Sequence, residues 1–142
     1  FIPRMRFVQV AFATDGKQVK DPEINMPKPP RSAFLVEECI DGRFRKYINN
    51  RQPVPSTNLK NSDDITCASF LAFTQHWQFK RTHGLAFVSD YQGGDDLLTD
   101  PQIMSDASLG HIFGNGNMAA GCRDFATAHQ CNEYCKFFGI DK

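Results

Sequence analysis

The stretch from residue 84 to residue 93 reads Gly-Leu-Ala-Phe-Val-Ser-Asp-Tyr-Gln-Gly. Its first half is a compact apolar run behind a glycine, which is typical of a short buried strand. Its second half is polar, so the expected strand delivers at its end Ser89, Asp90, Tyr91 and Gln92. We therefore expect the chemistry of this protein to begin where the strand stops.

Helices are expected on both sides of that strand. Ser62 or Asp63 can cap a helix whose first turn is acidic and whose apolar positions recur at three- and four-residue steps to about Lys80. Residues 93–116 carry acids and glycines, which is typical of a functional loop. A last helix is expected from about Met118.

The first sixty residues favour strands and loops. Residues 6–14 alternate in polarity and end at an Asp-Gly turn, which predicts a strand. The four prolines of residues 17–32 predict a surface loop. Residues 33–40 are a short apolar run that predicts a buried second strand, whereas residues 43–62 lack periodicity and predict a hinge.

Composition restricts the classes of function. The chain has 142 residues, the size of one domain, and its 41% hydrophobic and 23% charged residues exclude a disordered chain. Sixteen basic residues balance sixteen acidic ones, so no net charge attracts nucleic acid or an acidic membrane surface. The least polar stretch, residues 67–77, is too short to cross a bilayer. We therefore expect neither a nucleic-acid partner nor a membrane partner.

The first residue and the cysteines bear on where the protein works. The chain begins with Phe1 and lacks the layout of a signal peptide, so we expect it to be a piece of a longer protein. Five cysteines are an odd number at irregular spacings, which argues against a secreted disulfide framework. We therefore expect a reducing compartment, the cytoplasm, and thiols that are available to a metal.

Metal-ligating residues lie close together near the end of the sequence. His129, Cys131 and Cys135 form a His-x-Cys-x3-Cys pattern of borderline-soft ligands, which suits zinc and leaves a fourth ligand to come from elsewhere. Each residue also has a simpler explanation as a buried core side chain. The spacing by itself leaves zinc and an ordinary core both open.

The candidates for a fourth ligand are few. His76 lies near the end of the expected helix, on its apolar face, where an imidazole normally needs a partner. Cys122 is the rival, ahead of His83 and His111.

A second group of ligands consists of oxygen donors. Asp90, Gln92 and Asp100 place two carboxylates and an amide oxygen on a strand end and the loop after it. Magnesium bound with a nucleotide prefers such oxygens. Acidic loops are also commonly solvated turns, so the residues alone leave both interpretations open.

Four motifs in order resemble a known family. They are Asp-x-Gln-Gly at 90–93, Thr-Asp-Pro-x-Ile at 99–103, Phe-Gly-Asn-Gly-Asn at 113–117 and His-x-Cys-Asn-x2-Cys at 129–135. This order and spacing resemble the C-terminal lobe of the alpha-kinases, a family of atypical protein kinases.

The resemblance extends upstream, so that it spans about residues 33–140. Residues 72–77 are similar to the family's Ala-Phe-Ser-His-Trp segment, with Gln75 as an extra residue. Residues 34–42 and 46–50 are similar to the family's hinge and to the Lys-Tyr-Asn-Asn-Asn stretch after it.

The resemblance implies an α+β, protein-kinase-like fold in a single partial domain over residues 1–142. Residues 1–50 would be the remnant of the N-lobe sheet with the hinge. Residues 51–142 would be a C-lobe of helices and short strands stapled by zinc.

The resemblance also implies site residues. Asp90 would be the catalytic aspartate that positions or deprotonates the acceptor hydroxyl, and Gln92 and Asp100 would bind Mg²⁺ with ATP. The hinge backbone at Glu37, Glu38 and Ile40 would bind adenine. The zinc ligands would be His76, His129, Cys131 and Cys135. The glycine-rich loop, residues 114–121, would help to place the peptide.

The implied activity is ATP-dependent phosphorylation of serine or threonine on a protein substrate; the alternative is a zinc-stabilised pseudokinase or interaction module without turnover. The family's nucleotide lysine precedes the hinge on a strand, whereas here Lys17, Lys20 and Lys28 lie in a polar loop. We therefore expect the 142-residue chain by itself to transfer no phosphate. The alanines at 119–120 also replace family glycines.

Overall fold

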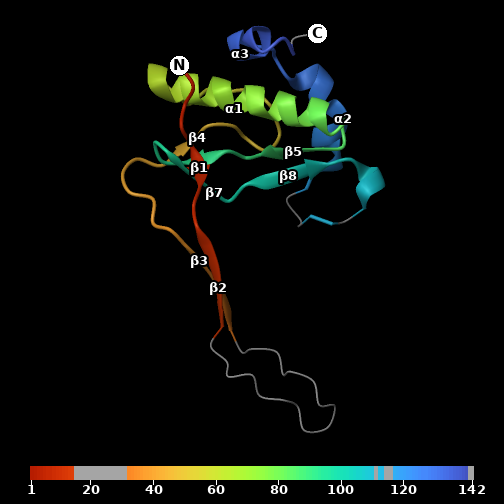
Figure 1. Ribbon diagram of the computed structural model, residues 1–142. Coiled ribbons are helices and arrows are strands. Elements are labelled where there is room, and N and C mark those ends of the chain that lie inside the picture. Colours follow the sequence, from red (N-terminus) through yellow and green to blue (C-terminus); the bar gives the residue numbers. More distant parts are fainter. Residues whose placement is uncertain (15–31, 111, 114–116, 141–142) are drawn as a thin grey trace, which may run out of the picture. The chain divides into compact units, whose positions relative to one another are not determined.

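Strands and helices come in separate runs along the described parts of the chain, with four short strands on each side of α1 and two further helices at the end, which confirms the α+β class (Figure 1). The structure, a computed structural model, describes residues 1–14, 32–110, 112–113 and 117–140. Contacts divide the chain into two compact units, one of Phe1–Phe7 with Ile40–Lys142 and one of Val8–Cys39. The predicted lobe boundary at residue 50 stays a prediction. Among the described residues, no helix is both long and apolar enough to cross a membrane.

Helix α1 spans Ser62–Arg81, which confirms the helix expected from the periodicity. Its N-cap lies one residue earlier than expected, because the Asn61 side chain accepts a hydrogen bond from the Asp63 backbone N–H at 2.8 Å. Acidic residues in the first turn and basic residues in the last turn complement the helix dipole. The expected strand after this helix is also present, as β5 (Ala86–Ser89), and α1 contacts it.

A four-stranded sheet holds the larger unit together, in the order β1-β7-β6-β4. Its strands are β1 (Arg6–Phe7), β4 (Arg45–Lys46), β6 (Gln92–Gly93) and β7 (Leu97–Thr99). Strand β1 runs parallel to β7, and the other pairs are antiparallel.

The loop expected at residues 93–116 is more structured than predicted. It contains β7, β8 (Gln102–Ser105), which pairs with β5, and the short 3₁₀ helix η1 (Ala107–Leu109). Strands of two to four residues are too short to show alternation in a sequence, and only their pairing partners reveal them.

Residues 43–62 are not a hinge between the two units, because the division falls between Cys39 and Ile40 and the whole segment belongs to the larger unit. Tyr47 and Ile48 are 1% and 0% exposed and belong to a core cluster with α1. Their backbone N–H groups both donate to the Tyr91 carbonyl, at 2.9 and 3.1 Å. The segment is therefore part of the larger unit's core.

The last helix of the prediction is two helices, α2 (Ala119–Ala128) and α3 (Glu133–Phe137). The side chain of Asn132 caps α3 by accepting from the N–H groups of Tyr134 and Cys135. Helix α2 buries Cys122 and Phe125 in a cluster with Phe87 and Met104 of the β5–β8 pair.

The smaller unit contains β2 (Val10–Thr14) and β3 (Ala33–Glu37), which pair antiparallel. The strand expected over residues 6–14 is thus divided between β1 and β2. Every residue of β3 is exposed, so the predicted burial of residues 33–40 is wrong for this strand. An apolar run shows that side chains can be buried, but burial also requires a covering layer, and the described residues of this unit form only the two paired strands.

Candidate active site and metal centre

The ends of three short strands bring the predicted catalytic and magnesium residues into one polar network. Asp90 follows β5, Gln92 lies in β6, and Asp100 follows β7. Lys46 of β4 joins them: its Nζ lies 2.6 Å from Asp90 Oδ1 and donates to Gln92 Oε1 at 2.9 Å. Gln92 Nε2 in turn donates to Asp100 Oδ2 at 3.3 Å. The three predicted residues therefore share one site.

Both aspartates of this network have an uncommon backbone conformation. Asp90 has φ of 62° and Asp100 has φ of 47°, in the left-handed region. Aspartate tolerates this region better than most residues, yet each such position costs about 1 kcal/mol or more. Strain of this kind concentrates at functional sites, where the surrounding structure maintains it.

Lys46 is the site residue that the sequence reasoning missed. It lies in the stretch at 46–50 that carries the resemblance, whereas the resemblance implies a functional lysine upstream of the hinge. Its side chain is 34% exposed, whereas that of Asp90 is 9% exposed, so the carboxylate is the more desolvated partner. A buried carboxylate needs a partner of opposite charge, and that requirement could have indicated a nearby lysine. The upstream lysines at 17, 20 and 28 lie outside the described residues.

Helix α1 anchors the strand end that carries Asp90. Gln78 Oε1 accepts from the Val88 N–H at 2.7 Å, and Gln75 Nε2 donates to the Val88 carbonyl at 3.0 Å. Gln78 Nε2 also donates to the Tyr91 hydroxyl at 3.3 Å, and Thr74 lies at the same distance from it. Burial raises the pKa of the Tyr91 hydroxyl, which stays neutral. Tyr91 thus points into the core, while its neighbours Asp90 and Gln92 join the polar network.

The four predicted zinc ligands form a second cluster. His76 comes from α1, His129 is the C-cap residue directly after α2, Cys131 lies in the connection, and Cys135 lies in α3. Their ligand atoms all lie within 4.8 Å of one another. His76 Nδ1 is 3.7 Å from Cys131 Sγ, and His129 Nε2 is 3.6 Å from Cys135 Sγ. Around tetrahedral zinc, neighbouring sulfur and nitrogen ligands are separated by about 3.6 Å, so this donor set fits the ion.

The surroundings of two of these side chains act in opposite directions on metal binding: they favour it at His129 and oppose it at Cys135. His129 Nδ1 lies 3.3 Å from the Pro53 carbonyl, which fixes the ring and leaves Nε2 toward the thiols. Burial lowers the pKa of His129, which favours the neutral imidazole that a metal requires. Burial raises the pKa of the Cys135 thiol, so a metal must displace its proton.

The rival ligands are not in this cluster. Cys122 Sγ donates to the Gly84 carbonyl at 3.0 Å within its own core cluster. His83 is exposed just after α1, and His111 lies outside the described residues. Across the part of the chain that the structure describes, the His76 cluster is the one such group of potential metal ligands.

The predicted adenine segment lies at the division between the two units. Glu37 ends β3, and the Glu38 N–H donates to the Gln9 carbonyl at 2.9 Å. The division falls between Cys39 and Ile40, so the structure does not place these residues relative to one another. Adenine binding there stays a prediction.

The glycine-rich loop is described only in its second half, because residues 114–116 lie outside the described residues. Asn117 Oδ1 accepts from the Ser105 N–H at 2.9 Å, which ties this part of the loop to the end of β8. Its role in peptide placement stays a prediction.

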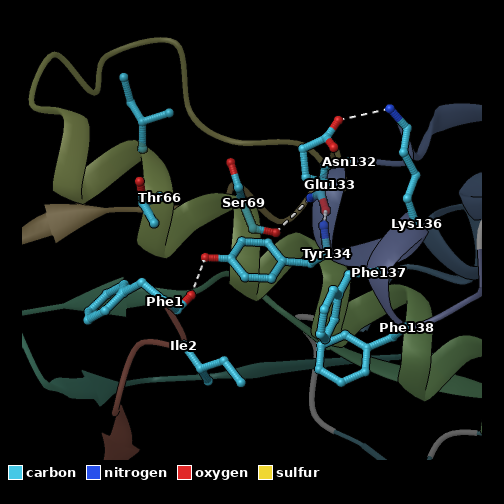
Figure 2. Close-up of a pocket in the computed structure, with 11 residues that line it drawn as sticks. Phe1, Ile2, Thr66, Ser69, Asn132, Glu133, Tyr134, Lys136, Phe137 and Phe138 are labelled. Atoms are coloured by element: carbon cyan, nitrogen blue, oxygen red, sulfur yellow. Dashed lines mark hydrogen bonds and ion pairs between the residues drawn. The ribbon is translucent and has the colours of Figure 1, made fainter.

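A cavity of about 890 Å³ is formed by other residues (Figure 2). Its walls are the first two residues of the chain, the N-terminal half of α1, and α3. The Tyr134 hydroxyl crosses it to donate to the Phe1 carbonyl at 2.8 Å, and Lys136 is paired with Glu133 at 2.8 Å. No residue of the polar network and none of the four zinc-type ligands lines it, and its mainly apolar walls do not suit a nucleotide's phosphates.

Comparisons with known proteins match the motifs. The model of the alpha-kinase family matches residues 2–135. The transient receptor potential cation channel subfamily M member 7 of Rattus norvegicus is 35% identical over 109 residues, which are 72% of this chain and 5% of that protein. Human eukaryotic elongation factor 2 kinase is 33% identical over 114 residues, 80% of this chain and 14% of that one.

Solved structures agree in fold. The apoenzyme alpha-kinase domain of myosin-II heavy chain kinase A superposes with a TM-score of 0.67 at 25% identity, covering 97% of this chain and 50% of that one. The same kinase domain in complex with AMP-PNP gives 0.65 at 27% identity, covering 96% and 48%. The chain thus spans about half of those domains and a small part of the curated relatives.

Proposed function

Since the chain belongs to the alpha-kinase family, we propose that it is the part of a protein kinase that transfers the γ-phosphate of ATP to serine or threonine side chains of a protein substrate. The observation that carries this proposal is the network of Lys46, Asp90, Gln92 and Asp100. Phosphoryl transfer depends on positioning and on neutralising charge rather than on covalent help from the enzyme.

Asp90 is the residue that we assign to the acceptor hydroxyl. Lys46 contacts its Oδ1, which leaves Oδ2 as the oxygen to orient the hydroxyl and accept its proton. The lysine also supplies a fixed positive charge beside the position of the transferred group. This charge is separate from the upstream nucleotide lysine that the resemblance implies.

Gln92 and Asp100 are the residues that would hold Mg²⁺. Carboxylate and amide oxygens are the hard donors this ion prefers, and the two side chains already touch. Gln92 turns its Nε2 toward Asp100 and its Oε1 toward Lys46, so a half turn of the amide that presents the oxygen beside Asp100 would exchange the Lys46 contact for the ion. The bound ion would neutralise charge on the phosphates.

The test is a phosphotransfer assay on the protein at its native length, with radiolabelled ATP and a basic acceptor protein. Asp90→Asn should lower kcat by about 10²- to 10⁴-fold, since it removes the proton acceptor. Asp124→Asn, at an exposed pair on α2, is the matched control and should keep the rate. Label on phosphoserine or phosphothreonine supports the proposal. An inert protein that retains bound metal and fold would favour the pseudokinase alternative instead.

We also propose that His76, His129, Cys131 and Cys135 bind one structural zinc ion in a reducing compartment. Support comes from the sulfur–nitrogen separations and from a closed set of four ligands that leaves no open position. The ion would join α1 to the α2–α3 connection.

Metal analysis of the purified protein tests the zinc site. Cys135→Ser should lose the metal and lower the melting temperature strongly, because structural zinc contributes about 10–16 kcal/mol of binding energy to folding. Cys39→Ser, at an exposed thiol outside the cluster, is the control. A protein without zinc, or a Cys135→Ser variant that keeps zinc and stability, would refute this assignment.

A further inference from the structure

Strand β4 places two basic side chains on opposite faces of the sheet. Its residues Arg45 and Lys46 pair with Gly93 and Gln92 of β6. Successive residues of a strand point to opposite sides, so one face carries Lys46 toward Asp90 and the other carries Arg45. A two-residue strand has few hydrogen bonds of its own, and therefore side chains must help to fix its position.

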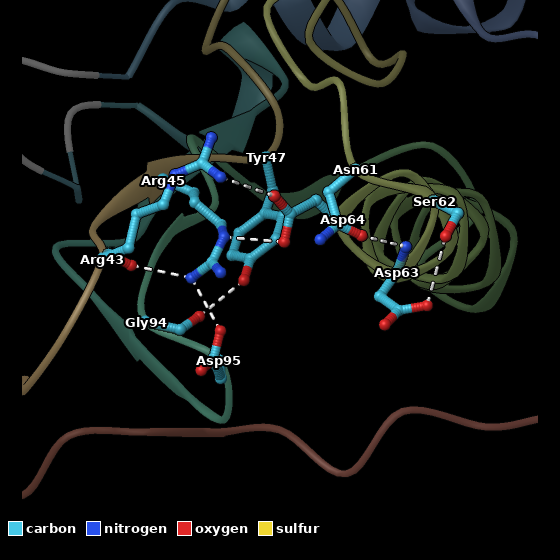
Figure 3. A network of polar contacts seen from close by, with 9 residues as sticks. All are labelled: Arg43, Arg45, Tyr47, Asn61, Ser62, Asp63, Asp64, Gly94 and Asp95. Atoms are coloured by element: carbon cyan, nitrogen blue, oxygen red, sulfur yellow. Dashed lines mark hydrogen bonds and ion pairs between the residues drawn. The ribbon is translucent and has the colours of Figure 1, made fainter.

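Arg45 is held between two carboxylates from different elements (Figure 3). Its Nε lies 2.6 Å from Asp64 Oδ1 in the first turn of α1, and its Nη1 lies 2.7 Å from Asp95 Oδ1 in the β6–β7 turn. Nη1 also donates to the Arg43 carbonyl at 2.7 Å. The side chains of Arg45 and Asp64 are 11% and 6% exposed, so this ion pair is shielded from solvent. We call Arg45, Asp64 and Asp95 the Arg45 clamp.

The elements that the clamp joins also position the catalytic network. Helix α1 holds Tyr91, between Asp90 and Gln92, through Gln78. The β6–β7 turn is held a second time, because the Tyr47 hydroxyl donates to the Gly94 carbonyl at 2.5 Å. The clamp therefore ties β4 to α1, which contacts Tyr91 beside Asp90, and to the turn that directly follows Gln92 and Gly93 of β6.

We propose that the Arg45 clamp is a positioning device that sets Lys46 on Asp90 for phosphoryl transfer. Arg45 does not touch the reacting groups; it acts through the adjacent lysine. This inference rests on the proposed kinase function. It adds the Arg45 clamp, which lies outside the polar network, to the residues that act at the proposed site.

Replacing arginine by lysine at position 45 separates the effect of positioning from the effect of charge. A guanidinium presents donors in a planar fork that can reach two carboxylates at once, whereas an ammonium is a point charge that cannot keep both contacts in the same geometry. Arg45→Lys therefore retains the charge that neutralises buried Asp64 and relaxes the position of β4. A displacement of about 1 Å at a catalytic group costs on the order of 100-fold in rate.

The experiment compares Arg45→Lys with Arg43→Lys in the native-length protein. Arg43 is the matched control because it is also an arginine that faces Asp64, but its side chain is 61% exposed and its Nη1 lies 3.8 Å from Asp64 Oδ2, a longer and weaker contact. We expect Arg45→Lys to lower kcat by about 10- to 100-fold, with the KM for ATP within about twofold and the melting temperature nearly kept. Arg43→Lys should keep the rate.

A double-mutant cycle tests whether Arg45 acts through Lys46. If it does, adding Arg45→Lys to Lys46→Gln costs clearly less than Arg45→Lys alone. Three results would overturn the inference and leave the kinase function intact. They are additive losses in the double variant, an unchanged kcat in Arg45→Lys, and a fall in melting temperature that accounts for the lost activity. An inert wild-type protein would overturn the proposed function and this inference together.

Discussion

Replacing Lys46 by methionine separates the chemical role of the network from its structural role. The change keeps the unbranched apolar stem of the side chain and removes its charged end. It takes away the cation 2.6 Å from Asp90, whose side chain is 9% exposed, and the donor to Gln92. A preorganised charge contact of this kind is worth about 10²- to 10³-fold in kcat, or roughly 3–4 kcal/mol in the transition state.

The effect of Lys46→Met on stability should be smaller. Breaking a fully buried ion pair costs about 3–5 kcal/mol, because the remaining charge is left unpaired. Here Lys46 is 34% exposed, so water reaches the pair, and we expect about 1–2 kcal/mol. A loss of that size lowers a melting temperature by about 2–8 °C.

The assay measures initial rates of phosphate transfer and thermal unfolding on the same preparations. Lys136→Met is the control, because Lys136 is 58% exposed and its ion pair with Glu133 lies at the surface. We expect the rate to fall in Lys46→Met alone. A Lys46→Met protein with the wild-type kcat would refute the reasoning, since the lysine would then be merely a structural partner of Asp90.

Three further predictions test other parts of the structure. Asp100→Ala should abolish phosphorylation but leave zinc content and fold intact; an active variant would show that Asp100 is only a turn residue. Gly93→Ala should lower the free energy of unfolding in urea by about 3 kcal/mol or more, because the new Cβ would lie 1.9 Å from the Leu97 carbonyl oxygen. Gly42→Ala has nothing within 4 Å of its new Cβ and should lower the free energy of unfolding by about 1 kcal/mol. Equal costs would contradict the β6–β7 register. Burial raises the pKa of Tyr47 from 10.0 to about 12, so the unfolded state loses its proton first and the free energy of unfolding should fall as pH rises between these values. Tyr47→Phe should remove this part of the pH dependence of stability. The same pH dependence in Tyr47→Phe and wild type would contradict the prediction.

Local patterns in the sequence predicted the elements that form through local interactions. Helix α1 and strand β5 were both expected, because the apolar period of a helix and a short apolar run are visible in any window of the chain. The order of the motifs also indicated the alpha-kinase fold. The polar residues at the end of β5 and the His-x-Cys-x3-Cys pattern indicated both sites.

The exposure of β3 and the strands within residues 93–116 were not predictable in this way. A strand of two to four residues is stabilised by its partner and not by its own composition. The apolar run at residues 33–37 has the composition of a buried strand, but whether a strand is covered depends on which elements pack over it.

The sequence by itself determined which residue types are available to the two sites, and the tertiary structure decided which of them meet. His76 lies 53 residues before His129, and this spacing does not predict that they meet. The packing of α1 against α3 brings the four potential ligands together. Lys46 and Asp90 are likewise brought together by the register of β4 on β6, which sends Lys46 to one face and Arg45 to the other. The reason is physical: distances between residues far apart in a chain are set by pairing and packing, which a linear pattern does not contain.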